Sequence, residues 1–363
     1  MLLTTVLLGL TTVLPADSVR RRLTLLPLPL VYYTPETRLA YGAAVTATLR
    51  FRRDAGDSTA RPSQLTVGAA YTQNRQLLLY VPFQVFYDHN RYYAYGEVGY
   101  YRYTYYFFGV GQQAVPRELY AVRFPRVRLN AFRRVLPTLP SGKLYAGLRY
   151  QFEDYHITQV AAEGQLATGI VPGSRGSRLC GGGGGVFFDS RDQVFFPTKG
   201  MVADVGFWLR NRATGAGNMG QTTSFDRYVA DVSSYHRLTR HAVLAMNYFT
   251  SFTSGEAPFN ALSLLGGTRR MRGYYEGRYR DQNAALLQSE LRVPLYKRLG
   301  AVAFGSLGVL GGQGQLLRLG APKAAYGTGL RFTVNRRDHL NLRVDYGLGR
   351  KSRGLYLTIG EAF

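Results

Sequence analysis

An arginine-rich segment and the polar strand face that follows it carry the clearest chemistry in this sequence. Five arginines fall within residues 266–281, at Arg269, Arg270, Arg272, Arg278 and Arg280. The next run places Glu290 on the polar side of an alternating pattern, which is typical of a half-buried strand. A guanidinium and a carboxylate held close together form a strong, charge-assisted hydrogen bond. We therefore expect the segment to fold back beside this strand, with one of its arginines paired to Glu290.

Two strand-like runs must position this chemistry. The first, 284–296, alternates between an apolar set and a polar set. The apolar side, with one serine, is Leu287, Ser289, Leu291, Val293 and Leu295; the polar side is Gln288, Glu290 and Arg292. The second run, 301–312, contains the sequence Phe304-Gly305-Ser306-Leu307-Gly308. The arginine-rich loop is thus followed by two predicted strands with polar positions that can face it.

The loop also carries a recognisable motif. Met271-Arg272-Gly273-Tyr274 resembles the (V/I)RG(F/Y) signature of the BamA/TamA-like outer-membrane barrels, the bacterial surface antigen superfamily. In that family the signature lies on a long extracellular loop that folds back into the barrel lumen. Its arginine pairs there with acidic residues on the next two strands.

The resemblance implies specific partners for Arg272. Glu290 and Arg292 lie on the strand that matches the first acidic strand of the family. The second family strand normally reads F-x-D-x-G, and Ser306 stands at the aspartate position here. We therefore expect Ser306 to occupy the place of the missing acid, and the substitution Ser306→Asp to strengthen the contact.

Composition excludes several classes of protein. The chain has 363 residues, of which 18% are charged, 42 are glycine and 28 are tyrosine. Beyond the N-terminus no apolar run approaches the roughly 20 residues of a membrane-spanning helix. A helical membrane protein is therefore excluded. A transmembrane β-barrel is compatible with the composition, because lumen-facing polar residues lower the average hydropathy.

The formal charge of +23 does not indicate nucleic-acid binding, because lysine and arginine are spread along the whole chain. Outer-membrane lipid and anionic lipopolysaccharide around the barrel, or an anion in its lumen, explain scattered arginines at least as well. The single cysteine, Cys180, excludes an intramolecular disulfide and a multi-cysteine metal site. No cofactor is expected.

Strand-like runs follow one another at a spacing that suits an all-β, closed antiparallel transmembrane barrel. Fifteen are predicted, at 38–52, 62–74, 76–88, 91–104, 118–134, 142–157, 181–190, 199–211, 222–237, 240–253, 284–296, 301–312, 323–335, 338–349 and 353–363. Bacterial single-chain barrels have an even number of strands, so we predict sixteen. Placing the arginine-rich loop outside the cell locates the uncounted strand before residue 118. The candidates are Tyr105–Gln112 and the segment before Tyr41.

The N-terminal residues are predicted to precede the barrel. The uncharged apolar run within residues 1–16 has the length of a signal peptide, with a first strand or a buried tail as the alternative. Residues 17–37 are interpreted as a lead-in segment whose three prolines exclude regular structure, and residues 38–363 as the barrel. Tyr33–Thr37 resembles the sequence that opens short barrels of this superfamily. The resemblance is to a short form, since no room remains for the POTRA domains of BamA and TamA.

Other motifs are interpreted as structural. The sequences Asp189–Asp192 and Phe196–Gly200 resemble a strand–turn–strand of the same family, and the glycine run 181–185 lacks the ending of a phosphate loop. The last strand alternates and ends in Phe363, as in barrels recognised by the outer-membrane insertion machinery. The five histidines are not accompanied by a G-x-S-x-G or HExxH motif, and we predict that the protein is not an enzyme.

Two functions follow from this interpretation. The first, implied by the resemblance, is a barrel in the outer membrane of a Gram-negative cell that assists insertion or translocation of client proteins, together with a separate periplasmic partner. The second is a passive pore, which its arginines would make anion-favouring, or a purely structural barrel. Steady conductance in planar bilayers would favour the pore.

Overall fold

The computed structural model describes residues 23–54, 57, 60–111, 116–136, 142–215, 221–312, 314–335 and 340–363. The predicted signal peptide, residues 1–16, and the first part of the predicted lead-in segment, residues 17–22, lie outside the described residues. In the described ranges, no helix is long and apolar enough to cross a membrane.

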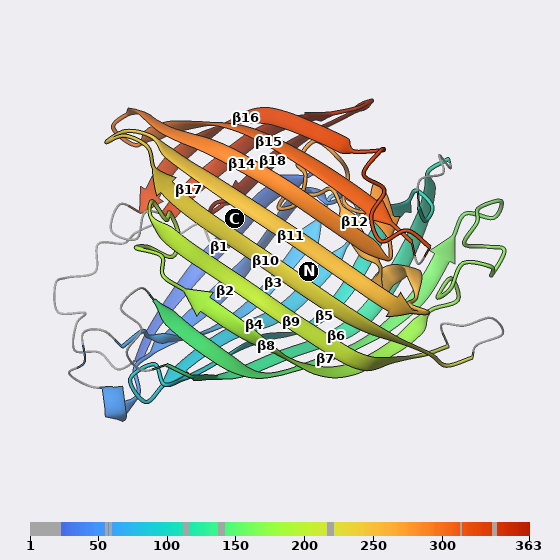
Figure 1. Ribbon diagram of the computed structural model, residues 1–363, viewed down its shortest axis with the longest axis horizontal. Coiled ribbons are helices and arrows are strands. Elements are labelled where there is room, and N and C mark those ends of the chain that lie inside the picture. The colour runs from blue at the N-terminus through green and yellow to red at the C-terminus, as the bar shows by residue number, and fades with distance from the viewer. Residues whose placement is uncertain are drawn as a thin grey trace.

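Sixteen antiparallel strands, counted over the described residues, close into one barrel, which confirms the predicted fold (Figure 1). The first eight are β1 (Leu23–Thr34), β2 (Arg38–Leu49), β3 (Ser63–Thr72), β4 (Leu77–Tyr87), β5 (Tyr92–Phe107), β6 (Glu118–Arg134), β7 (Lys143–Val160) and β8 (Ser177–Asp189). The other eight are β9 (Gly200–Thr214), β10 (Thr223–Arg237), β11 (Val243–Gly255), β14 (Asn283–Tyr296), β15 (Leu299–Gly311), β16 (Lys323–Asn335), β17 (Leu340–Gly349) and β18 (Ser352–Ile359). Closure gives every strand a neighbouring strand on both sides, which is how a sheet satisfies its backbone groups in hydrocarbon.

The alternation in the sequence becomes the two faces of the wall. On β17, Val344 and Tyr346 are exposed on the outside, whereas Arg343 and Asp345 are buried on the lumen side. The same alternation on β14 separates exposed Leu291 from buried neighbours. An apolar outer face and a polar inner face are what a transmembrane barrel needs.

The uncounted strand is β1, in the segment before Tyr41. Residues 105–107 instead belong to the end of β5. The expectation that prolines exclude regular structure in the lead-in segment was wrong, because Pro27 and Pro29 both lie within β1. All twelve residues of β1 are in register with β2, but its other side meets β18 at one registered pair across their described lengths, Tyr33 with Leu357. Proline, which has no N–H to donate, is tolerated on such an edge-like strand.

The two ends of the barrel differ. The outer rim, predicted to be extracellular, carries the β1–β2 turn and the segment between β11 and β14. The inner rim carries the β8–β9 turn and the end of β18.

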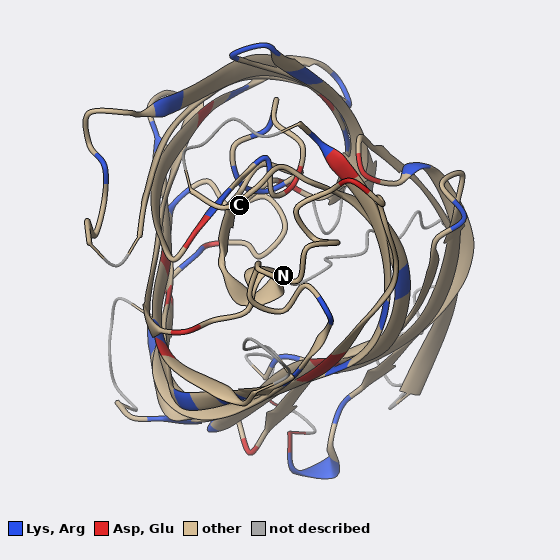
Figure 2. Cartoon of the chain, turned by 90° about the vertical axis from the view of Figure 1, so that its right-hand side faces the viewer, with Lys and Arg blue, Asp and Glu red and all other residues tan. Residues whose placement is uncertain are grey.

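Residues 256–282, which we call the lumen loop, contain the 3₁₀ turn η4 (Phe259–Ala261) and a small hairpin of β12 (Ser263–Leu265) and β13 (Tyr279–Asp281). Viewed along the barrel, segments of chain lie inside the ring of strands (Figure 2).

The last strand is shorter than predicted. β18 ends at Ile359, and Gly360 adopts a φ of 78° that redirects the chain. The final residues lie inside the ring, where Ala362 is buried (Figure 2). Phe363 therefore does not extend the terminal strand, and the tail contributes polar groups to the lumen instead.

Candidate functional site: the lumen loop

Glycines allow the tip of the lumen loop to approach the barrel wall. Gly266, Gly267 and Gly273 have φ angles of 111°, 93° and 110°, a backbone conformation that residues other than glycine rarely adopt. A Cβ on Gly273 would also lie within 2.9 Å of the Leu348 backbone on β17. Across this contact, a Cβ on Gly347 would come within 2.6 Å of the Gly273 nitrogen. The two glycines therefore permit a backbone-to-backbone contact between loop and wall.

This contact places Arg272 against the lumen side of the barrel wall, where its side chain is 2% exposed. One terminal nitrogen donates to the Glu290 carboxylate on β14, and the other donates to the Asp345 carboxylate on β17. The guanidinium carbon lies 3.7 Å from the centre of the Phe304 ring on β15. Arg272 thus joins three strands of the wall to the loop.

Arg272 belongs to a larger buried set, which we call the ion cluster. It comprises four arginines, Arg272, Arg292, Arg331 and Arg343, and three acids, Glu290, Asp345 and Glu361. Arg292 Nε lies 3.1 Å from Glu290, and Arg331 pairs with Asp345 at 2.6 Å and with Glu361 at 2.7 Å. Such buried charges need one another, because each would be costly without its partner.

The structure brings the motif residues Met271–Tyr274 together with Glu290 and Arg292, but it does not place Ser306 beside Arg272. The Ser306 hydroxyl donates instead to the Ala325 carbonyl at 3.3 Å. The second carboxylate comes from Asp345, one strand further along the barrel than Ala325. The sequence contained a signal for it, since Asp345-Tyr346-Gly347 repeats the D-x-G spacing on β17 and Asp345 falls on the polar face.

Hydrogen bonds to backbone groups also hold the motif. The Tyr356 hydroxyl accepts from the Gly273 nitrogen at 3.0 Å and donates to the Tyr274 carbonyl at 3.2 Å. Ser352 donates to the Gly273 carbonyl at 2.7 Å, and the Tyr274 hydroxyl donates to the Ala324 carbonyl at 2.9 Å. The main chain beside Arg272 is therefore fixed by β16, the β17–β18 hairpin and β18.

Met271 shows a second way in which the loop is held. It is a non-glycine residue with a φ of 62°, and its nitrogen donates to the Gln288 side chain at 3.0 Å. The Gln288 amide donates in turn to the Arg269 carbonyl at 3.0 Å. One glutamine on β14 therefore satisfies both sides of the strained turn.

The other end of the lumen loop reaches the opposite wall. Phe259 is 1% exposed and packs edge-on against Phe107, Tyr120 and Tyr155, at centroid distances of 5.5, 5.6 and 6.1 Å. The next residue, Asn260, donates to Glu153 on β7 at 3.3 Å. Sequence reasoning missed this contact, because Phe259 lies in a short irregular segment without periodicity.

The tip of the loop also contacts the first hairpin. The Glu276 nitrogen donates to the Glu36 carboxylate in the β1–β2 turn at 2.8 Å, and Tyr275 packs against Tyr106 at 5.5 Å. Burial raises the pKa of Glu276 to about 7, and the charge of Glu36 adds to the shift. The loop therefore spans the lumen from β14–β18 to β5–β7 and to the strand that begins the barrel.

The remaining motifs are structural in their contacts. The Asp192 carboxylate accepts from the Gln193, Thr198 and Lys199 nitrogens and so shapes the β8–β9 turn. Cys180 is exposed and lies near the Tyr150 hydroxyl. The site as a whole binds and positions chain segments through ion pairs, hydrogen bonds and ring contacts.

Fold and site together define a class of protein: a sixteen-stranded transmembrane β-barrel, over the residues described, whose lumen is crossed by an ordered loop. The Omp85 superfamily domain matches residues 30–363, and the chain belongs to this superfamily. Its members are outer-membrane barrels for protein insertion or transport. The resemblance to BamA-like barrels inferred from the motif is thereby confirmed.

Three solved structures share the fold. BamA from Haemophilus ducreyi lacking POTRA domains 1–3 has 12% identity and a TM-score of 0.57, over 94% of this chain and 70% of that one. CdiB from Acinetobacter baumannii has 13% identity and a TM-score of 0.60, over 94% and 60%. CdiB from Escherichia coli has 12% identity and a TM-score of 0.62, over 93% and 63%. The chain thus spans less than two thirds of either CdiB. Direct comparison with curated protein sequences gives no match.

Proposed function

We propose that this protein assists the insertion or translocation of client proteins at the outer membrane, and that the seam between β1 and β18 is where it acts. The observation that carries the proposal is the imbalance of pairing on β1. All twelve residues of β1 are in register with β2, whereas one pair joins β1 to β18 over their described lengths. An under-paired strand edge is a template for another strand.

The lumen loop is suited to control this seam. Ser352 and Tyr356 on β18 bind the Gly273–Tyr274 backbone, and Glu36 in the β1–β2 turn accepts a hydrogen bond from the Glu276 nitrogen. The loop therefore contacts β18 and the turn that follows β1, on both sides of the seam at the outer rim. In our proposal a docked loop holds the two strands near each other, and a client strand enters by pairing along the open part of the edge.

The proposal includes partners outside this chain. Client outer-membrane proteins would pair with the seam, and a separate periplasmic partner would deliver them. Lipid and lipopolysaccharide of a Gram-negative outer membrane would surround the wall. Depletion of the protein, followed by quantitative proteomics of the outer membrane, is expected to lower a subset of barrels or surface proteins and thereby name the clients.

A disulfide across the seam tests the proposal directly. Tyr33→Cys with Leu357→Cys, in a Cys180→Ser background, places two cysteines at directly opposed positions. Facing residues of an antiparallel pair lie at a separation that a disulfide can bridge. We expect oxidation to abolish client insertion in proteoliposomes and a reductant to restore it.

The matched control uses the same strand on its other side. Tyr33→Cys with Leu39→Cys joins β1 to β2, which are already paired throughout. This bridge is expected to leave insertion unchanged. Full insertion with the seam bridged, or equal loss in both variants, would contradict a role for the seam.

A passive, anion-favouring pore is the second candidate, and the surplus of arginine in the ion cluster favours it. Arg272, Arg292, Arg331 and Arg343 each have one buried nitrogen without a hydrogen-bond partner in the part of the chain described. Planar-bilayer recording separates the two functions. Steady anion-selective current from the wild type, with no effect of the seam bridge, would assign the protein to the pore class.

A further inference from the structure

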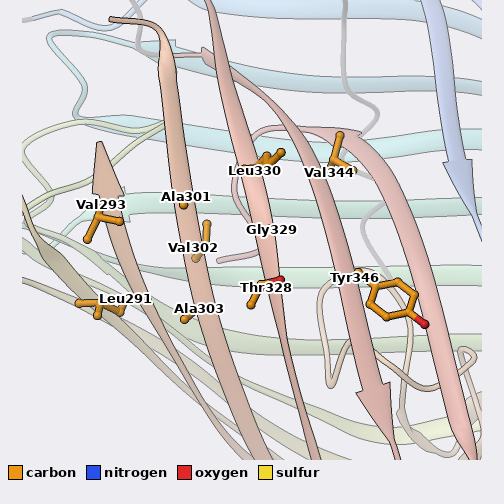
Figure 3. Close-up of a pocket in the computed structure, with 10 residues that line it drawn as sticks. All are labelled: Leu291, Val293, Ala301, Val302, Ala303, Thr328, Gly329, Leu330, Val344 and Tyr346. Atoms are coloured by element: carbon orange, nitrogen blue, oxygen red, sulfur yellow. The ribbon is translucent and has the colours of Figure 1, made fainter. Parts of the chain in front are cut away.

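The lipid-facing wall has a hollow directly behind the ion cluster. It has a volume of about 460 Å³ and spans β14, β15, β16 and β17 (Figure 3). Its lining is apolar apart from the hydroxyls of one threonine and one tyrosine: Leu291, Val293, Ala301, Val302, Ala303, Thr328, Gly329, Leu330, Val344 and Tyr346. A volume of this size falls in the range of small-molecule sites, which is roughly 300–1,000 Å³.

Side-chain size creates the hollow. The outward residues in the middle of β15 are small, Ala301 and Ala303, and a Cβ on Gly305 would meet no atom within 4 Å. The neighbouring strands carry larger outward residues, among them Leu291 and Leu330, which are 40% and 55% exposed. The small residues therefore form a floor and the large ones a rim. An apolar, chain-shaped ligand fits such a surface better than a polar one.

Two cations lie at one end of this floor. Lys297 and Arg298 form the exposed turn between β14 and β15, at the inner rim. Neither forms an ion pair with the residues that the structure describes, and the Lys297 nitrogen lies 4.9 Å from the Tyr296 ring centre. Arg298 precedes Ala301 by three residues, or about 10 Å along an extended strand. The spacing matches an anionic headgroup at the rim with its hydrocarbon chain on the floor.

We propose that this hollow, together with Lys297 and Arg298, binds an anionic glycerophospholipid from the leaflet at the inner rim. The acyl chain lies over Ala301 and Ala303, and the phosphate lies beside the two cations. Charge complementarity selects this occupant over a zwitterionic lipid, since basic residues next to a membrane attract anionic headgroups. The site is independent of the proposed role of the seam in insertion.

The position of the hollow gives the lipid a structural effect. Leu291 lies between Glu290 and Arg292 in sequence, and Val344 lies between Arg343 and Asp345. The strands that hold the ion cluster on the lumen side thus hold the lipid on the other side. A chain packed on the floor fills space that would otherwise weaken the contact between these strands.

Quenching of tryptophan fluorescence by brominated lipid tests the proposal on the full chain in bilayers. The reporter is Leu330→Trp at the rim, and the matched reporter is Val67→Trp, on the lipid-facing side of β3 and 56% exposed before substitution. Dibrominated phosphatidylglycerol is compared with dibrominated phosphatidylethanolamine, and the signal of the native Trp208 is subtracted using the wild type. We expect the reporter at 330 to prefer phosphatidylglycerol about thirtyfold, the scale of two basic side chains, and the reporter at 67 to show no preference.

Two further variants decide between occupants, after heat-modifiable gel migration has shown that each is folded. Lys297→Gln with Arg298→Gln is expected to remove the preference, and Ala301→Leu with Ala303→Leu to remove it by filling the floor. Equal quenching by the two lipids at residue 330, or a preference that survives the glutamine variant, would overturn the proposal. Self-association of the wild type that the leucine variant abolishes would assign the hollow to a second copy of the chain instead.

Discussion

The lumen loop is attached at two places, and the two attachments differ in kind. At one, Arg272 lies between the carboxylates of Glu290 and Asp345. At the other, Phe259 packs among the rings of Phe107 and Tyr155. We call these the ionic anchor and the aromatic anchor. Both are almost fully buried, so the difference lies in the interactions that hold them and not in their exposure to solvent.

The two anchors should respond differently to substitution. A buried guanidinium that bridges two carboxylates cannot be replaced by an apolar group, because its charge and its directed hydrogen bonds are lost together. Ring contacts depend mainly on area and shape, and a smaller apolar residue retains part of both. The ionic anchor should therefore be released abruptly, and the aromatic anchor gradually.

Loss of the ionic anchor should have the largest effect. Arg272→Ala removes the guanidinium that Glu290 and Asp345 share and leaves these acids with Arg292, Arg331 and Arg343 alone, which costs up to about 3–5 kcal/mol. We expect the loop to leave the lumen, with faster cleavage by trypsin and a higher, unsteady conductance. The matched control is Arg278→Ala in the same loop, where the arginine lies 4.8 Å from the Phe108 ring. Its loss should cost about 0.5–1 kcal/mol; equal effects would refute the ionic anchor.

Truncation at the aromatic anchor should come next. Phe259→Ala removes a buried ring at a cost of about 3 kcal/mol, the lower end for such a change. Phe259→Leu should recover more than half of the loss, whereas no conservative change, not even Arg272→Lys, should do so at the ionic anchor. Urea denaturation and proteolysis of the loop measure both series. If Arg272→Lys retained more than half of the stability lost in Arg272→Ala, the two anchors would not differ in the way proposed.

A carboxylate added at residue 306 should lower the stability of the protein. Because Asp345 already supplies the second acid, Ser306→Asp adds a buried charge and removes the hydroxyl bonded to the Ala325 carbonyl. We expect a loss of about 1–3 kcal/mol, in contrast to the strengthening expected from the family pattern alone. Ser306→Ala, which removes only the hydroxyl, is the control. A gain in heat resistance with aspartate would restore the original expectation.

The smallest effect should be on pH dependence at the loop tip. Burial and the charge of Glu36 raise the pKa of Glu276 to about 7, from an ordinary value of 4.5. The docked loop therefore holds this proton more tightly than the open loop, so docking is favoured at low pH and weakens as pH rises through about 7. We expect a severalfold rise in loop cleavage between pH 5.5 and 8, relative to Glu276→Gln at each pH. If the ratio of wild-type cleavage to Glu276→Gln cleavage stayed constant across this pH range, Glu276 would not control docking of the loop.

Much of this architecture could be predicted from the sequence. Period-two alternation, as on β17, defines strands because each side chain must face lipid or lumen. The number of strands followed from closure and parity. β1 could not be assigned, since Pro27 and Pro29 oppose the strand and only its edge-like position makes them tolerable. Local patterns decide what a strand looks like, but not how completely its neighbour will pair with it.

The site was predictable to the extent that its partners are near in sequence. Glu290 follows Arg272 by 18 residues and could be found from the adjacent strand. Asp345 follows by 73 residues, and its role depends on the curvature that brings β17 beside β14 across two intervening strands. Phe259 could not be found, because its partners lie on β5–β7, far from it along the chain. Closure of the barrel decides these contacts.

The separation of these partners along the chain also sets an order of folding. Arg272 can meet Glu290 as soon as β14 has formed, but Asp345 and Tyr356 belong to the last two strands. Contacts so distant in sequence form late, after the intervening loop has been closed. A fully docked loop therefore exists only in a barrel that has received its final strand. Resistance of this loop to protease should therefore report that the last two strands are in place.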